Sequence, residues 1–152
     1  MNEKAAIKDI IVNKKARFEY HIFTTYEAGI SLVGTEVKSL RNKNVNLTDS
    51  YALLKDGEVW LVNAHIGVFK QGNLNNHEPL RKRRLLLHKA EIRKLYKFQK
   101  EKGYTLVALR IYFKDGKIKV EIAVAKGKKE YDKREAIAKK EAIIDINRKK
   151  SY

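Results

Sequence analysis

The feature that most constrains the fold is a pair of alternating segments in the C-terminal half of the 152-residue chain. Apolar side chains occupy nearly every second position over residues 105–113 and again over residues 118–124. Between the two segments lies Lys114-Asp115-Gly116-Lys117, and an Asp-Gly pair is a strong short-range signal for a hairpin turn. The pattern therefore predicts two long antiparallel strands and, with them, a largely β protein.

Other segments predict shorter strands and a few helices. Alternating or short apolar runs predict strands over residues 18–23, 28–33, 51–54, 59–66 and 84–87. Helical spacing predicts helices over residues 35–42 and 88–102, the second of which ends at Gly103. Residues 1–12 show no clear period, so we expect a flexible N-terminus there.

These elements predict one domain that is mainly β. Short strands with few helices in a small chain favour a partly open antiparallel barrel like the oligonucleotide/oligosaccharide-binding (OB) fold, flanked by short helices. We expect residues 13–130 to form this body. In residues 131–152, Ala and Ile lie among charges at helix-compatible spacing, and such a weakly apolar helix is marginal in water. We therefore expect a basic C-terminal tail that is disordered when free and helical when bound.

The charge of the chain is strongly positive and unevenly placed. Lys plus Arg number 34 against 18 Asp plus Glu, for a net charge of +16, and residues 81–102 alone carry ten basic and two acidic side chains. Solubility favours mixed signs, so a field of one sign indicates a polyanionic partner. A membrane role lacks an amphipathic anchor with bulky interfacial aromatics, and no apolar run can span a bilayer. The sequence thus predicts a cytoplasmic protein that binds nucleic acid.

No arrangement of residues predicts catalysis. The chain has no cysteine, and its four histidines have no metal-ligand spacing. No P-loop, dinucleotide fingerprint or nucleophile-elbow sequence is present, and the acidic residues are dispersed. We expect no enzymatic activity, no metal and no cofactor.

Short sequence blocks occur in a characteristic order. They are Asn13-Lys14-Lys15-Ala16, Tyr26-Glu27-Ala28-Gly29-Ile30, Gly34-Thr35-Glu36-Val37-Lys38-Ser39-Leu40-Arg41, Arg83-Arg84-Leu85-Leu86-Leu87-His88, and Ala125-Lys126-Gly127-Lys128-Lys129 followed by Asp132-Lys133-Arg134. Together they resemble the SsrA-binding protein (small protein B) family, the bacterial partners of transfer-messenger RNA. The resemblance covers residues 13–134.

The resemblance implies a function without catalysis. Members of this family bind the tRNA-like domain of transfer-messenger RNA and deliver it to stalled ribosomes for trans-translation. Their C-terminal tail enters the empty mRNA channel near the decoding centre. The expected partners are therefore transfer-messenger RNA and the ribosome with its small-subunit RNA, with one protein monomer per RNA. The alternative is a general ribosomal RNA-binding or RNA-chaperone barrel protein, which composition alone supports equally well.

The RNA-binding residues expected in the body come from three of the blocks, together with Arg17, which directly follows the first of them. They are Asn13, Lys14, Lys15, Arg17, Glu36, Lys38, Ser39, Arg41, Lys126, Gly127, Lys128 and Lys129. Lysine and arginine suit phosphates, and a serine hydroxyl suits sugar or phosphate. Gly127 allows close approach of backbone to RNA, although it could equally be an ordinary end to a strand.

Glu36 is unexpected among RNA-binding residues because a carboxylate repels phosphate. It could accept a hydrogen bond from a base amino group, orient a neighbouring Lys or Arg, or simply occupy the first turn of a helix. We expect Glu36→Ala to lose RNA binding without losing thermal stability, whereas an unfolded variant would favour a purely structural role for Glu36.

The tail residues expected to bind the ribosome are Tyr131, Asp132, Lys133, Arg134, Lys139, Lys140 and Arg148. The basic members would follow ribosomal RNA phosphates. Tyr131 would stack on a nucleotide near the decoding centre, as the resemblance suggests. The chain departs from the family at Phe18, where a polar aromatic is common, and at Ala138, where a lysine is common.

Overall fold

The computed structural model describes residues 6–101 and 103–128, apart from the side chains of residues 72–74. Its strands are β1 (Ile7–Val12), β2 (Tyr20–Ile30), β3 (Val45–Asn46), β4 (Tyr51–Lys55), β5 (Glu58–Val62), β6 (His65–Ile66), β7 (Arg83–Leu86), β8 (Tyr104–Lys114) and β9 (Lys117–Gly127). Its helices are α1 (Lys14–Glu19), α2 (Gly34–Arg41), the 3₁₀ helix η1 (Lys70–Asn75) and α3 (Lys89–Lys100). The tail residues 131–152 and Lys129 lie outside the described residues.

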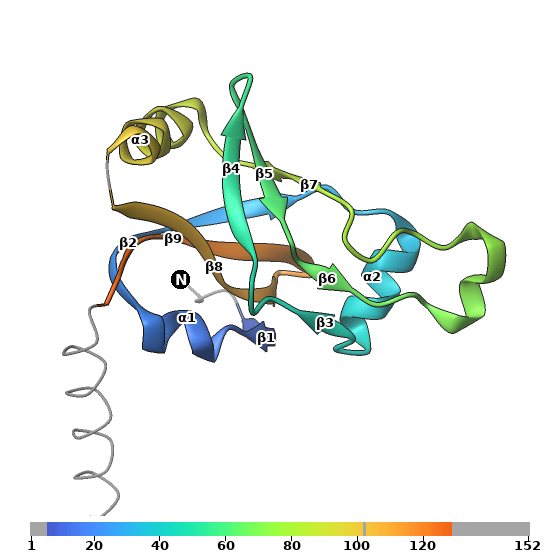
Figure 1. Ribbon diagram of the computed structural model, residues 1–152. Helices are drawn as coiled ribbons and strands as arrows, with labels where there is room; N and C mark the ends of the chain where they lie inside the picture. Colours follow the sequence, from blue (N-terminus) through green and yellow to red (C-terminus); the bar gives the residue numbers. More distant parts are fainter. Residues whose placement is uncertain (1–5, 102, 129–152) are drawn as a thin grey trace, which may run out of the picture.

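The main antiparallel sheet curves into a ring (Figure 1). Its strand order is β1-β8-β4-β5-β7-β2-β9, and β9 also pairs with β8, which closes the barrel. Two of the strand pairings contain few paired residues. In the strand ladders, one residue pair, Tyr51 and Val107, joins β4 to β8, and two residue pairs join β2 to β7. The barrel is therefore partly open, and the predicted mainly β, OB-like architecture is confirmed.

The hairpin predicted at Asp115-Gly116 is confirmed, and Asp56-Gly57 forms a second hairpin of the same kind between β4 and β5. Asp115 and Gly116 have φ of 51° and 74°, and Asp56 and Gly57 have φ of 54° and 77°. Positive φ at both central positions is what a tight two-residue hairpin turn requires, and Asp and Gly adopt it at low cost. These turns fix the registers in which Lys114 pairs with Lys117 and Lys55 with Glu58.

The long strand β8 does not keep a single inward face. A register shift between Ala108 and Arg110 marks a bulge opposite β9. Before the bulge, Leu106 and Ala108 belong to the main core, and Ile111 joins the same core after it. Val107 and Leu109 belong instead to a smaller cluster that includes Ala16 of α1. One extra residue in a strand reverses which parity points inward. Simple alternation over residues 105–113 thus predicted the strand correctly but not its faces.

The N-terminal third differs from the sequence prediction. The expected flexible segment over residues 1–12 contains strand β1, which pairs with β8 more than ninety positions along the chain. The start of the strand expected over residues 18–23 is helix α1, because the Asn13 side chain accepts a hydrogen bond from the Ala16 backbone N–H at 3.1 Å and caps a turn. Phe18 therefore lies on this helix and is 41% exposed. The strands expected separately over residues 18–23 and 28–33 are replaced by one continuous strand, β2.

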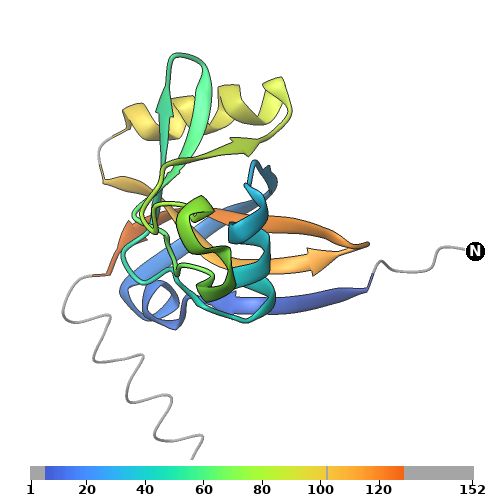
Figure 2. The ribbon, with the colours of Figure 1, turned by 90° about the vertical axis from the view of Figure 1, so that its right-hand side faces the viewer.

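The helices lie on different sides of the barrel. Helix α3 packs beside the β4–β5 hairpin in both views, and the Gln99 side chain accepts a hydrogen bond from the Leu54 backbone N–H at 2.9 Å (Figures 1 and 2). Helix α2 lies at the right of Figure 1 and α1 at the lower left. The positions of α1 and α2 separate the predicted RNA-binding residues of the body into two groups.

Candidate nucleic-acid interface

The first group of predicted residues surrounds helix α1. Lys14, Lys15 and Arg17 are exposed, whereas Asn13 is buried. The Asn13 amide donates hydrogen bonds to the carbonyls of Leu47 and Ala108, each at 3.0 Å. Asn13 therefore anchors α1 to the barrel, and the lysines and arginine that follow it are the side chains presented to solvent.

The end of β9 joins this same surface. Tyr20 pairs with Gly127 and His21 with Lys126 in the β2–β9 ladder, and the Lys128 backbone N–H donates to the Glu19 carbonyl at 2.8 Å. Two sequence blocks separated by more than a hundred residues thus meet at one edge of the barrel. We call α1 together with residues 126–128 the α1 edge. Gly127 ends its strand and is exposed, so both of its sequence interpretations stand.

An aromatic group that the sequence did not single out lies beside the α1 edge. The Lys126 ammonium is 4.3 Å from the centroid of the Tyr104 ring and 5.9 Å from that of Phe23. The two rings meet edge to face at 5.4 Å, and Phe23 is 56% exposed. An exposed ring beside a cation is suitable for stacking on a nucleic-acid base, although it could also be an ordinary exposed residue of a strand. The sequence signal that could have found Phe23 is the alternation of β2, which places this residue among the exposed positions of the strand.

The second group of predicted residues belongs to helix α2. Lys38 and Arg41 are exposed, and the Lys38 ammonium lies 5.3 Å from the centre of the Phe69 ring. Glu36 and Ser39 are on the opposite, buried side of the same helix. The Ser39 hydroxyl donates to the Gly67 carbonyl at 2.6 Å, which fastens α2 to the segment after β6.

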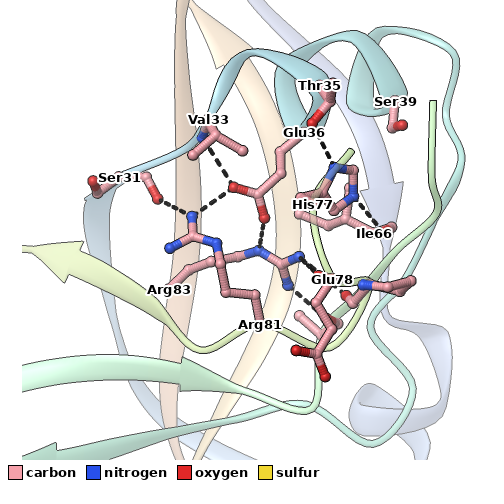
Figure 3. A network of polar contacts seen from close by, with 12 residues as sticks. Ser31, Val33, Thr35, Glu36, Ser39, Ile66, His77, Glu78, Arg81 and Arg83 are labelled. Carbon is pink, nitrogen blue, oxygen red and sulfur yellow. Dashed lines mark hydrogen bonds and ion pairs between the residues drawn. The ribbon is translucent and has the colours of Figure 1, made fainter. Parts of the chain in front are cut away.

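Glu36 is the centre of a buried polar network (Figure 3). Its side chain is 0% exposed. One carboxylate oxygen accepts hydrogen bonds from the Val33 backbone N–H at 2.9 Å and from Arg81 Nη2 at 2.5 Å, and the other accepts from Arg83 Nε. Burial raises the pKa of Glu36, but hydrogen bonds from Arg81, Val33 and Arg83 outweigh it, so the pKa lies below its ordinary value of 4.5. Glu36 is therefore held as a carboxylate.

Arg83 completes the network from strand β7. It is also 0% exposed, yet its donors are used: besides Glu36, it donates to the carbonyls of Ala64 at 2.7 Å, Pro79 at 3.0 Å and Glu78 at 3.4 Å. Burial lowers the pKa of Arg83, and the adjacent Glu36 opposes that shift. A buried charge is tolerated only when it is paired and hydrogen-bonded, and both conditions are met here.

These contacts change the interpretation of three predicted residues. Asn13, Glu36 and Ser39 are buried and hydrogen-bonded inside the body, so their side chains are not presented to an external RNA. Of the hypotheses for Glu36, the structure matches the one in which it orients neighbouring arginines. The exposed members of the prediction are Lys14, Lys15, Arg17, Lys38, Arg41 and Gly127, with Lys126 and Lys128 half-buried.

The described part of the chain gives two further observations. No three His, Cys, Asp or Glu side chains within residues 6–101 and 103–128 gather in a way that could hold a metal ion. No helix within these residues is long and apolar enough to cross a membrane.

Comparison with known proteins gives consistent matches over nearly the whole chain. The family described as "SmpB protein" matches residues 10–152. Proteins named "SsrA-binding protein" from Syntrophomonas wolfei and Symbiobacterium thermophilum are 56% and 59% identical over 142 and 146 residues; the alignments cover 93% and 95% of this chain and 90% and 92% of theirs. A solved structure described as "tmRNA-SmpB: a journey to the center of the bacterial ribosome" is 47% identical with a TM-score of 0.68, and covers 84% of this chain and 93% of its own.

Proposed function

The chain belongs to the SmpB protein family, and we propose from this that it binds the tRNA-like domain of transfer-messenger RNA and delivers it to stalled ribosomes in the bacterial cytoplasm. Its role is to bind, and peptidyl transfer belongs to the ribosome. In this proposal the body holds the tRNA-like domain, and the tail of residues 131–152 enters the empty mRNA channel near the decoding centre.

The observation that carries the proposal is the match to the solved structure described by tmRNA and SmpB in the bacterial ribosome. At 47% identity over 84% of the chain, the likeness reaches well beyond a shared fold. The named relatives, which are described as binding SsrA, agree with it over more than nine-tenths of the chain.

The exposed cations of the body are consistent with this function. The α1 edge presents Lys14, Lys15 and Arg17, and helix α2 presents Lys38 and Arg41. Lys15 faces Asp49 at 3.6 Å, and such an exposed pair contributes little and exchanges readily for a phosphate, while Arg17 faces the partly buried Glu121 at 3.5 Å. We propose these five residues, with Lys126, Lys128 and Lys129, as phosphate contacts. Asn13, Glu36 and Ser39 support them from within.

The tail is assigned the ribosomal contacts. Tyr131 is proposed to stack on a nucleotide, and the basic tail residues to follow phosphates of the small-subunit RNA. The residues proposed are those predicted from the sequence: Tyr131, Asp132, Lys133, Arg134, Lys139, Lys140 and Arg148.

The proposal is tested by comparing affinities for a tRNA-like fragment of transfer-messenger RNA and for an ordinary tRNA across a salt series. Family function requires a preference for the fragment that persists as salt rises. Equal affinities with a shared steep salt dependence would indicate non-specific polyanion binding, and with it the general RNA-binding alternative.

Truncation separates the body from the tail. Removal of residues 131–152 is expected to leave affinity for the tRNA-like fragment within about threefold, because few contacts are lost there. The same protein is expected to lose tagging of chains on stalled ribosomes in a reconstituted translation reaction. A full-length Tyr131→Ala variant is the control that keeps the tail's charge. A large loss of fragment binding on truncation would contradict this division of roles.

A further inference from the structure

The network around Glu36 contains more positive than negative charge. One carboxylate faces two guanidinium groups, those of Arg81 and Arg83, so the three side chains together carry one excess positive charge. The Arg83 side chain is fully enclosed, whereas that of Arg81 is 36% exposed. The excess charge therefore meets solvent at Arg81.

The two arginines also differ in how many of their donors are used. Arg83 donates to Glu36 and to three backbone carbonyls. Arg81 uses Nη2 for both of its contacts, to Glu36 at 2.5 Å and to the Ser31 carbonyl at 3.3 Å. Its other terminal nitrogen makes no hydrogen bond to the residues drawn in Figure 3. Arg81 thus has a charged donor left for a partner outside the network.

The geometry holds this donor in place before any partner arrives. An arginine normally loses side-chain freedom when it binds an anion, and that loss subtracts from affinity. Here the Glu36 carboxylate accepts a hydrogen bond from Arg81 Nη2 and so holds the Arg81 guanidinium in place. The carboxylate itself is fixed by the Val33 backbone N–H and by Arg83. Much of the ordering has therefore taken place during folding.

The surroundings of Arg81 suit a phosphate. Lys82 follows it in the chain and is exposed, which adds a second positive charge to the same segment. Apart from Glu36, no acidic side chain among the described residues forms an ion pair with Arg81. Arg84, by contrast, makes an exposed surface pair with Glu58 at 3.4 Å, so no buried carboxylate holds its guanidinium in place.

We propose that Arg81, positioned by Glu36, donates a hydrogen bond from its solvent-facing edge to a backbone phosphate of the bound RNA. Glu36 is then a positioning residue that acts through Arg81 and does not itself contact RNA. The proposal rests on the proposed function for the identity of the RNA. It assigns a binding role to a residue that no sequence block singled out for RNA contact.

The test compares Arg81→Gln with Arg84→Gln, since both variants remove one positive charge from exposed arginines of the same segment. Affinity for the tRNA-like fragment is measured from low to high salt, and thermal unfolding is recorded for each variant. Arg81→Gln is expected to weaken binding about fivefold and to reduce the salt slope by about one unit, and Arg84→Gln to change both much less. Arg81→Lys, which keeps the charge and loses the fork of donors, is expected to keep the slope while weakening binding.

The outcomes separate the two proposals. If Arg81→Gln and Arg84→Gln behave alike in affinity and slope, the role of Arg81 is overturned while the proposed function stands. If the wild-type protein shows no preference for the fragment over tRNA, the proposed function falls, and the slope difference still decides for or against an Arg81–phosphate contact. Repeating the series with small ribosomal subunits shows whether ribosomal RNA supplies the phosphate. A folded Arg81→Gln variant with wild-type binding to every RNA ends the proposal.

Discussion

Helices α2 and α3 begin with the same local arrangement and lie in opposite environments. In each, a glutamate at the third helical position accepts a hydrogen bond from the backbone N–H that precedes the helix. Glu36 accepts from Val33 at 2.9 Å, and Glu91 accepts from His88 at 3.1 Å. Glu36 is buried and bonded to Arg81 and Arg83, whereas Glu91 lies at the surface, and the described residues give it no ion pair.

The difference shows what a capping glutamate can become when tertiary structure surrounds it. At Glu91 the carboxylate satisfies one orphan donor and favours the positive end of the helix, which contributes a few tenths to about 1 kcal/mol. At Glu36 the same bond is joined by two guanidinium groups, of which that of Arg83 is fully buried and that of Arg81 is partly exposed. Removing the carboxylate there also leaves a buried arginine without its counter-charge.

The largest expected effect comes from comparing Glu36→Ala with Glu91→Ala. Both variants lose the cap bond, but only the first isolates Arg83 in the interior. We expect Glu36→Ala to lower the free energy of unfolding by about 3–5 kcal/mol, and Glu91→Ala by about 0.5–1 kcal/mol. Urea denaturation followed by circular dichroism measures both. Equal losses would show that the Glu36 network adds nothing beyond the cap. This expectation replaces the sequence-based one, in which Glu36→Ala keeps its stability.

A smaller effect is expected at the arginine end of the network. Arg83→Lys keeps the charge but loses donors to the carbonyls of Ala64, Glu78 and Pro79, so buried acceptors are left unpaired. We expect a loss of about 2–3 kcal/mol by the same denaturation measurement. Arg84→Lys is the control, since this neighbouring side chain is exposed and half-solvated, and its loss is expected to stay below about 0.5 kcal/mol. Similar losses of unfolding free energy in both variants would show that the hydrogen bonds of the buried Arg83 guanidinium are not important for stability.

The smallest effect is expected in mild acid. Because the pKa of Glu36 is lowered in the folded state, its contribution is fully present above the unfolded value of 4.5 and is lost as the pH falls through the folded value. Stability should therefore hold from neutral pH to about 4.5 and fall below it. In a Glu36→Gln variant part of this decline should be missing.

Glu27 sets the background for this measurement. A hydrogen bond from Tyr112 and the nearby Lys114 lower its pKa despite the opposing effect of burial, so it also favours the folded state above its unfolded pKa. Some acid dependence is therefore expected to remain in Glu36→Gln. A variant that retains the complete wild-type profile would show that Glu36 is not the carboxylate being titrated.

Much of the fold was predictable because its signals are local. The Asp-Gly turns at residues 56–57 and 115–116 need positive φ, which few residue pairs adopt so easily, and the helices over residues 35–42 and 88–102 agree with α2 and α3 to within one or two residues at each end. Strand β1 was missed because the strand with which it pairs, β8, lies far along the chain. The bulge in β8 was missed because the apolar residues still alternate along the strand. The alternation does not show that the side chains pointing into the core change at the bulge.

The candidate site was predictable only in part. The short blocks contain cations that are exposed on α1 and α2, and on α2 helical spacing places Lys38 and Arg41 away from the buried Leu40. They also grouped Asn13, Glu36 and Ser39 with those cations, because a block of sequence does not say which of its members face inward. Arg81 was passed over, since a basic run of four residues gives no sign of which side chain finds a carboxylate.

The sequence by itself determined where the chain turns, which segments alternate, where positive charge gathers and that Glu36 would stand in the first turn of a helix. Strand alternation even places Arg83 on the same face of β7 as the buried Leu85. Only the tertiary structure decided that this face would bring Arg83 to Glu36, forty-seven positions earlier in the chain. A buried charge needs its partner at hydrogen-bond distance, and that distance depends on how the barrel closes.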